Sequence, residues 1–162
     1  MKVQEELSEE AVQKAIVDLT EFCSVHSWKV LYSNKRINQF HNNTITLYEN
    51  RRSEILYYIF LHEVGHAWML GCDSTYSDRY RELVRNPLRY ATVTYKIAKV
   101  QEEIEAWDVG KRVARDLGLP INESKFEKIR AQCLSGYMNW AGKRRKRHGT
   151  ESDITTSINS TV

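Results

Sequence analysis

The chain has 162 residues, 41% of them apolar and 28% charged, with a formal net charge of +3 at pH 7. This length and composition are typical of one soluble globular domain that buries its own core. No stretch approaches the roughly 20 apolar residues of a membrane span, and the amino terminus lacks the apolar segment of a signal peptide, so we expect a cytoplasmic protein without membrane contact.

The cysteine content also bears on the compartment. Cys23, Cys72 and Cys133 are odd in number, widely spaced and in no CxxC pair. This pattern argues against a disulfide framework and against a cysteine-type zinc site. It agrees with a reducing cytoplasm.

The first third of the chain predicts one helix and two strands. Ser8 can cap a helix that runs to about Ser24, because apolar residues recur there with a 3.6-residue period. Residues 28–32 and 44–48 have the pattern of short strands, and the residues 34–43 between them are polar. If the strand over 44–48 lies at a sheet edge, it could hold an extended peptide by strand addition.

A second helix is expected from Ser53, as its N-cap, to Leu70, with Gly71 where the helix would stop. One apolar stripe of this helix contains Ile55, Ile59, His62, His66 and Met69 or Leu70. The two histidines therefore face the interior.

This helix carries His62-Glu63-Val64-Gly65-His66, an HExxH pattern. Residues four apart on a helix lie on the same face, so the two imidazoles can close on one zinc ion. Glu63 is turned by about 100° from His62, where its carboxylate can take a proton from a zinc-activated water. The alternative is two core histidines bonded to backbone, which is costly for two ionisable groups on one apolar face.

Between Gly71 and about Asn86 the chain is polar and rich in Tyr and Arg, and part of it is expected to form a short helix that ends at Asn86-Pro87. Asp73 and Asp78 are candidate ligands by composition alone. Carboxylates in such a loop are more commonly exposed to solvent and bind no metal ion.

A further helix is predicted from Tyr95 to about Leu117, closed by Gly118-Leu119-Pro120. Its buried arc contains Val100, Ala106, Trp107, Gly110, Val113, Ala114 and Leu117.

Three glutamates of this helix differ in position. Glu103 lies near the middle of the buried arc, Glu102 at its margin and Glu105 on the far side. A carboxylate on a buried face needs a cation, and a catalytic zinc needs a third protein ligand. We therefore predict Glu103 as that ligand, with Glu102 as the alternative. A purely structural reading pairs Glu103 with a lysine such as Lys99.

The last predicted helix runs from about Glu123 to Arg144, with Pro120 and Asn122 at its start. Its inward stripe is Phe126, Ile129, Cys133, Leu134, Tyr137, Met138 and Ala141. We expect this helix to cover the other two.

The basic character of the chain is confined to its end. Residues 143–147 are all Lys or Arg and are followed by Glu151 and Asp153, so residues 1–142 are neutral overall and have no composition typical of nucleic-acid binding. We expect one domain over 1–142 and a disordered tail over 143–162, basic and then rich in Ser and Thr. Residues 143–148 could contact nucleic acid weakly, although a solvated helix end is the commoner meaning of such a run.

The HExxH pattern, its apolar lead-in and the downstream Glu103-Ile104-Glu105-Ala106 together resemble the small zincin-type metallopeptidases of the ImmA/IrrE family. The resemblance covers roughly residues 44–118. It implies an α+β fold with a single zincin-like domain (a minimal gluzincin), mostly helical with a short β-sheet, from a bacterium, phage or mobile element. It also implies zinc bound by His62, His66 and Glu103, with Glu63 as general base.

Two related signatures fit less well. The longer metzincin pattern is excluded because Met69 and Cys72 stand where its Gly and third His would be. SprT-like proteases usually take a histidine as third ligand, and no His lies between His66 and His148.

The predicted function is zinc-dependent endopeptidase activity on a protein or peptide substrate, with a donor such as Tyr90, Tyr95 or Arg89 for the oxyanion. The first alternative is a non-catalytic zinc protein in which the same site joins two helices and the surface binds a partner. The second is a nucleic-acid-associated protein that acts through residues 143–148.

Overall fold

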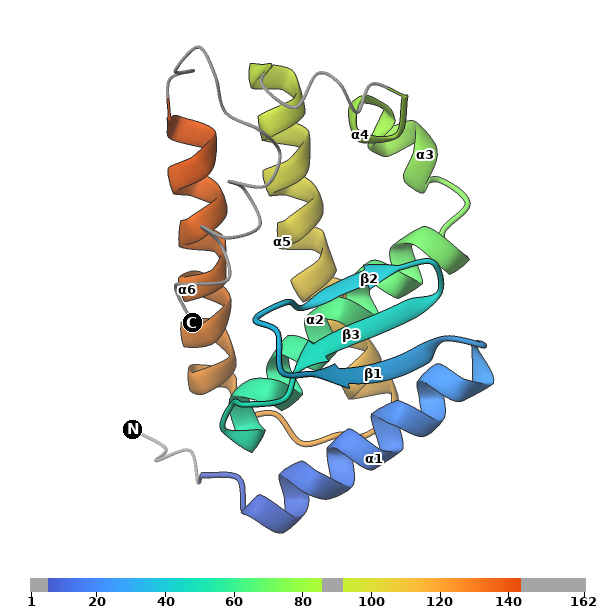
Figure 1. Ribbon diagram of the computed structural model, residues 1–162, viewed down its shortest axis with the longest axis vertical. Coiled ribbons are helices and arrows are strands. Elements are labelled where there is room, and N and C mark those ends of the chain that lie inside the picture. Colours follow the sequence, from blue (N-terminus) through green and yellow to red (C-terminus); the bar gives the residue numbers. More distant parts are fainter. Residues whose placement is uncertain (1–5, 86–91, 144–162) are drawn as a thin grey trace.

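The structure is a computed structural model that describes residues 6–85 and 92–143 (Figure 1). The fold is α+β, mostly helical with one small three-stranded sheet, as the sequence predicted. The elements in chain order are α1 (Glu9–Val25), β1 (Lys29–Ser33), β2 (Gln39–His41), β3 (Thr44–Tyr48), α2 (Ser53–Cys72), α3 (Tyr76–Arg79), α4 (Arg81–Arg85), α5 (Val93–Asp116) and α6 (Glu123–Gly142).

Three of the long helices begin at a side-chain cap. Ser8 Oγ accepts from the Ala11 amide at 3.2 Å, which confirms the predicted start of α1. The Thr92 hydroxyl caps α5, so that helix begins two residues earlier than predicted, and Asn122 Oδ1 caps α6. Each cap satisfies a backbone N–H that has no partner within the helix. Gly118 has φ +66 just after α5, a conformation that suits glycine and lets the chain turn.

The predicted ends of α2 were both wrong. Arg52 occupies the N-cap position without a side-chain cap, and Ser53 is the first helical residue, with its Oγ accepting from Gln13 at 3.1 Å. Gly71 does not stop the helix, which continues to Cys72. A Cβ at Gly71 would lie 3.5 Å from the Trp28 ring, so this glycine sits within the helix against an aromatic side chain.

The sheet has the strand order β1-β3-β2, with β1 parallel and β2 antiparallel to β3. The strand β3 is therefore central, and the expectation that it could add a peptide at a sheet edge is wrong because both of its edges are paired. The strand β2 lies inside the polar segment 34–43, where no strand was predicted. Asn42 and Asn43 both have positive φ and join β2 to β3 in a two-residue hairpin turn.

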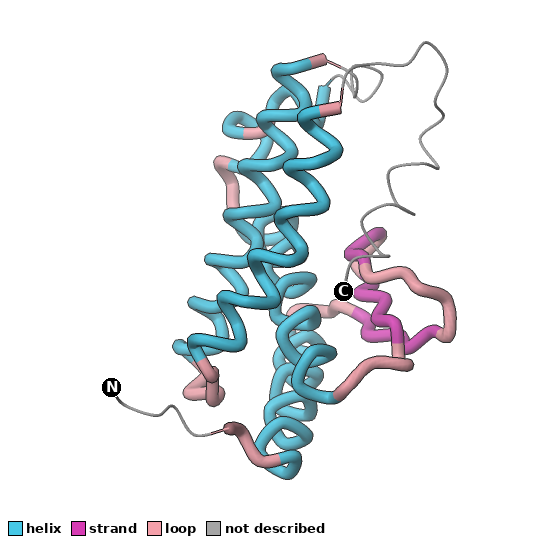
Figure 2. The backbone as a smooth tube through the Cα atoms, turned by 90° about the vertical axis from the view of Figure 1, so that its left-hand side faces the viewer, coloured by secondary structure: helices cyan, strands magenta, loops and turns pink. Residues whose placement is uncertain are grey.

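The helix α2 is the centre of the fold. Every residue from Tyr57 to Ala67 is buried, and α2 contacts α1, β2, β3, α5 and α6. It runs behind the sheet in Figure 1, and Figure 2 shows the three strands on one side of the helices. None of the described helices is long and apolar enough to cross a bilayer.

Two apolar residues predicted to face inward, Leu117 and Met138, are exposed instead, and of the alternatives Met69 and Leu70 it is Met69 that is buried. Leu117 lies at the end of α5, where the chain turns, and Leu119 is buried in its place. Met138 is about 120° around α6 from the buried Phe126 and therefore faces solvent. The predicted tail over 143–162 lies outside the described residues, apart from Lys143.

The helices α2 and α5 touch through their backbones. A Cβ built on Gly65 would lie 1.9 Å from the Ala106 carbonyl oxygen, and one on Gly110 would lie 2.1 Å from the Leu61 carbonyl oxygen. Each helix thus contributes a glycine that faces the backbone of the other. This approach brings Glu103, one turn before Ala106, toward the histidines of α2.

We expect Gly65→Ala and Gly110→Ala to destabilise the protein by about 1–3 kcal/mol or more, because the new methyl group meets backbone that cannot move aside. The measurement is the free energy of unfolding by chemical denaturation. Gly71→Ala is the matched control in α2, since its Cβ meets Trp28 at an ordinary contact distance. Equal stability of Gly65→Ala and Gly71→Ala would contradict the close helix contact.

Candidate metal site

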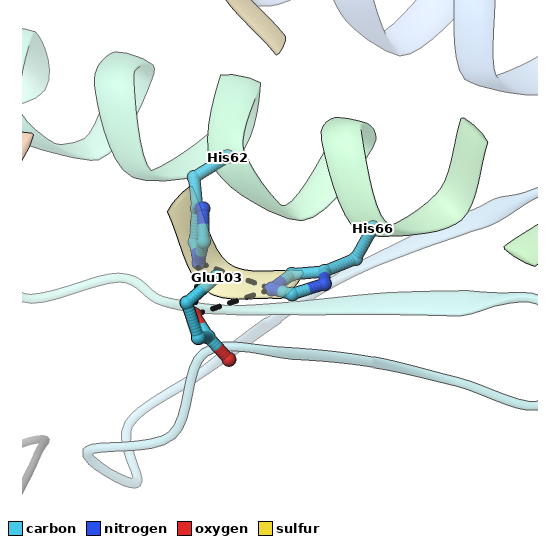
Figure 3. Close-up of side chains that lie close together, drawn as sticks. All are labelled: His62, His66 and Glu103. Carbon is cyan, nitrogen blue, oxygen red and sulfur yellow. Dashed lines mark hydrogen bonds and ion pairs between the residues drawn. The ribbon is translucent and has the colours of Figure 1, made fainter. Parts of the chain in front are cut away.

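Three buried side chains from two helices converge on one point (Figure 3). His62 and His66 project from α2, and their Nε2 atoms are 3.2 Å apart. Glu103 projects from α5, and its Oε2 is 3.2 Å from His62 Nε2 and 3.4 Å from His66 Nε2. Within residues 6–85 and 92–143, this is the only group of three His, Cys, Asp or Glu side chains that could hold a metal ion.

The dimensions of this triangle fit a metal ion. A four-coordinate ion with ligand bonds of about 2.0–2.1 Å has neighbouring ligand atoms about 3.3–3.4 Å apart, close to the three separations observed. Glu103 Oε2 is buried and has no hydrogen-bond partner. A buried acceptor in this condition is costly, and a cation between the three atoms would satisfy it. The chain could therefore hold a metal ion here.

Glu102 lies behind His66 and does not face the centre of the triangle. Its Oε1 accepts from His66 Nδ1 at 2.9 Å, and the Tyr76 hydroxyl lies 3.4 Å from the same oxygen. This contact orients the ring so that the lone pair of His66 Nε2 points toward the centre of the triangle. Carboxylates commonly orient metal-binding histidines in this way. Glu102 is buried, not marginal as predicted, and the structure places Glu103 instead of Glu102 against the Nε2 atoms.

Lys99 contacts both glutamates, one turn earlier on α5. Its Nζ lies 2.7 Å from Glu102 Oε2 and 2.7 Å from Glu103 Oε1. The ion pair between Lys99 and Glu103, which was the alternative to metal binding in the sequence analysis, is therefore present. It uses the Glu103 oxygen that faces away from the imidazoles, so the ion pair and a metal ion can share this carboxylate.

His62 is held by an aromatic contact instead of a carboxylate. Trp107 stacks on its ring with centroids 4.5 Å apart and an interplanar angle of 19°. His62 Nδ1 is buried without a hydrogen-bond partner. From the sequence, Trp107 was predicted only as a core residue. It lies four residues after Glu103 on the same helix face, and this spacing could have indicated that Trp107 is near the ligands.

The charges of the cluster compensate each other. Burial raises the pKa of Glu103, but Lys99 and His66 lower it more, so it falls well below its usual range. Burial likewise opposes ionisation of Glu102, yet His66 and Lys99 bring its pKa to about 2. Burial lowers the pKa of His66, but the two carboxylates raise it well above its usual value. Protonated His66 and Lys99 thus balance Glu102 and Glu103, and a metal ion at Nε2 would displace the proton from His66.

Glu63 is buried beside these groups on α2. Burial raises its pKa to about 7, with the positive charge of His66 as the main opposing effect. A carboxylate with its pKa near neutrality is suited to accepting and releasing a proton.

The other candidates from the sequence lie elsewhere. Asp73 binds Thr75 and Arg79, and Asp78 is exposed beside Arg81, so both belong to the surface around α3 and α4. Tyr95 is in the first turn of α5, about 12 Å along the helix axis from Glu103. Arg89 and Tyr90 lie outside the described residues.

Two tyrosines that the sequence did not select lie against the cluster. Tyr76 from α3 contacts Glu102, and Tyr137 from α6 lies close enough to Glu103 for that carboxylate to affect its pKa. Burial and the Glu103 carboxylate raise the pKa of Tyr137 well above its usual value, so the phenol keeps its proton.

No protein-family model, curated protein or solved structure matches this chain. The residues of the site are therefore the basis for a proposed function.

We expect Glu63→Gln to stabilise the metal-free protein at pH 8 and to leave its stability nearly unchanged at pH 4.5. The folded-state pKa of Glu63, about 7, exceeds the ordinary 4.5, so its contribution to stability is complete below pH 4.5 and is lost as the pH rises through 7. Glutamine removes this loss, on the order of 3 kcal/mol at pH 8. Chemical denaturation in the presence of a chelator measures the difference.

Glu21→Gln, at an exposed position of α1, is the control for loss of a carboxylate as such. A Glu63→Gln variant that is less stable than wild type at pH 8 would contradict the proposed burial of an ionisable Glu63.

Proposed function

We propose that this chain is a zinc-dependent metallopeptidase of the zincin type, an endopeptidase in which His62, His66 and Glu103 bind zinc and Glu63 is the general base. The observation that carries the proposal is the buried triangle of two Nε2 atoms and one carboxylate oxygen, with sides of 3.2, 3.2 and 3.4 Å. Two imidazoles and one glutamate are a ligand set of catalytic zinc sites.

The choice of zinc follows from the donor set. Imidazole nitrogen suits zinc and other late transition metals, whereas calcium and magnesium take oxygen ligands. Three protein ligands leave one position of a tetrahedral ion free, as catalytic sites require. When bound, zinc supplies a Lewis acid that polarises the scissile carbonyl and acidifies water.

Glu63 carries the proton in this mechanism. Its carboxylate accepts a proton from the attacking water as the water oxygen bonds to the scissile carbonyl carbon. Glu63 then donates that proton to the amine nitrogen as the carbon–nitrogen bond breaks. Its buried position next to His62 suits both steps.

The resemblance to the ImmA/IrrE family supports the same assignment. An HExxH helix followed by a glutamate on the next long helix is the arrangement that the resemblance implies. Membership of that family, and an origin in a bacterium, phage or mobile element, are part of this proposal.

Metal analysis by mass spectrometry after dialysis tests the ligand set. We expect about one zinc per wild-type chain and a sharp reduction in Glu103→Ala. Glu102→Gln should weaken zinc binding by about 10–100-fold, because it removes the carboxylate that orients His66. Glu105→Ala is the matched control on α5, since Glu105 pairs with Arg79 outside the site. Full zinc content in Glu103→Ala would overturn this assignment.

The catalytic assignment is tested with a mixed peptide library whose products are identified by mass spectrometry. Glu63→Gln should keep its zinc and lose cleavage by about 10²–10⁴-fold or more, because it removes the general base. Cleavage by Glu63→Gln at the wild-type rate would exclude Glu63 as the base. A zinc-loaded wild type that cleaves no peptide would favour the non-catalytic zinc protein.

A further inference from the structure

Lys99 is placed to control how Glu103 can bind a metal ion. It lies on α5, one turn before Glu103, and its side chain is 30% exposed. Its Nζ contacts Glu103 Oε1 and Glu102 Oε2, each at 2.7 Å. The ring of Tyr137 from α6 lies 5.9 Å from the same ammonium group.

The two oxygens of Glu103 have different surroundings. Oε2 faces the imidazoles and has no hydrogen-bond partner, whereas Oε1 is bound to Lys99. A free carboxylate can bind a metal ion through one oxygen or through both. The contact between a lysine and a carboxylate at this distance is a charge-assisted hydrogen bond, which is stronger than a neutral one.

Lys99 is itself anchored. If Glu103 turned to present both oxygens to the metal ion, Lys99 would have to follow Oε1 and leave Glu102, or remain and lose Oε1. Glu102 is in turn fixed by His66 at 2.9 Å. The chain of contacts from His66 through Glu102 and Lys99 to Glu103 therefore opposes that rotation.

We propose that Lys99 is a positioning residue that restricts Glu103 to one metal-binding oxygen and so keeps a coordination position open. The proposal depends on the metal site described above. The open position is the one that a water or substrate would need.

A simpler role for Lys99 is charge neutralisation. In that case, its loss would change the stability of the protein or its affinity for metal ions, but not the number of ligand atoms. The coordination number therefore distinguishes the two roles, and cobalt(II) reports it. Four-coordinate cobalt(II) absorbs visible light several times more strongly than the five- or six-coordinate ion.

The experiment titrates cobalt(II) into the full metal-free chain and records the absorption per bound ion. We expect wild type to bind one ion with the strong four-coordinate spectrum. Lys99→Met should still bind one ion but lose intensity severalfold, because Glu103 Oε1 then loses its cationic partner and can turn toward the metal ion. Lys99→Arg should retain the strong spectrum, since it keeps a cation that can donate to Oε1.

Lys111→Met is the matched control. Lys111 is also on α5 and also bridges two glutamates, Glu123 and Glu127, but outside the site. Its variant should have the wild-type spectrum.

Two results would overturn the proposal. One is a Lys99→Met spectrum as intense as that of wild type, with one ion bound. The other is a weak spectrum in wild type itself, a result that can be obtained even if the Lys99 variants do not fold. Failure of wild type to bind any cobalt would instead refute the metal site on which the proposal rests.

Discussion

The backbone contact between α2 and α5 is the constraint on which the rest of the structure depends. Gly65 and Gly110 allow it, because any side chain at either position would overlap a carbonyl of the facing helix. The candidate ligands are divided between these two helices, so the same contact sets both the packing of the core and the width of the site. The separations of 3.2 and 3.4 Å from Glu103 Oε2 to the two imidazole nitrogens require helices at this distance.

The site places an unusual concentration of ionisable groups in the core, and its stability depends on their mutual compensation. Glu102 and Glu103 are balanced by Lys99 and by a proton on His66, and a metal ion would replace that proton. The two histidines are supported differently. His66 has a carboxylate behind it, whereas His62 has the face of Trp107. One ligand is thus oriented by a hydrogen bond and the other by packing.

The proposed chemistry has two parts, metal binding and hydrolysis, that involve different residues. Metal binding would require the convergence of α2 with α5, whereas hydrolysis would require Glu63, a buried residue of α2 next to His62. The sheet and α1 pack on α2 and keep its middle turns buried, which raises the pKa of Glu63 to about 7. The helix α6 closes the other side and contributes Tyr137 next to Glu103. The supporting elements therefore act on the site mainly by excluding water from it.

The sequence alone determined the features that depend on neighbours along the chain. The spans of the long helices, the cap at Ser8 and the shared face of His62 and His66 all follow from helical periodicity, which is local. The sequence favoured Glu103 over the adjacent Glu102 but left Glu102 open, and the packing of α5 on α2 decides between them, because adjacent residues are turned by about 100° on the helix. The central place of β3 in the sheet also depends on long-range contacts, whereas the pairing of Lys99 with Glu102 and Glu103 is local to α5. A periodic pattern shows which face of a helix is buried, but the partner that covers that face is fixed by packing between distant segments.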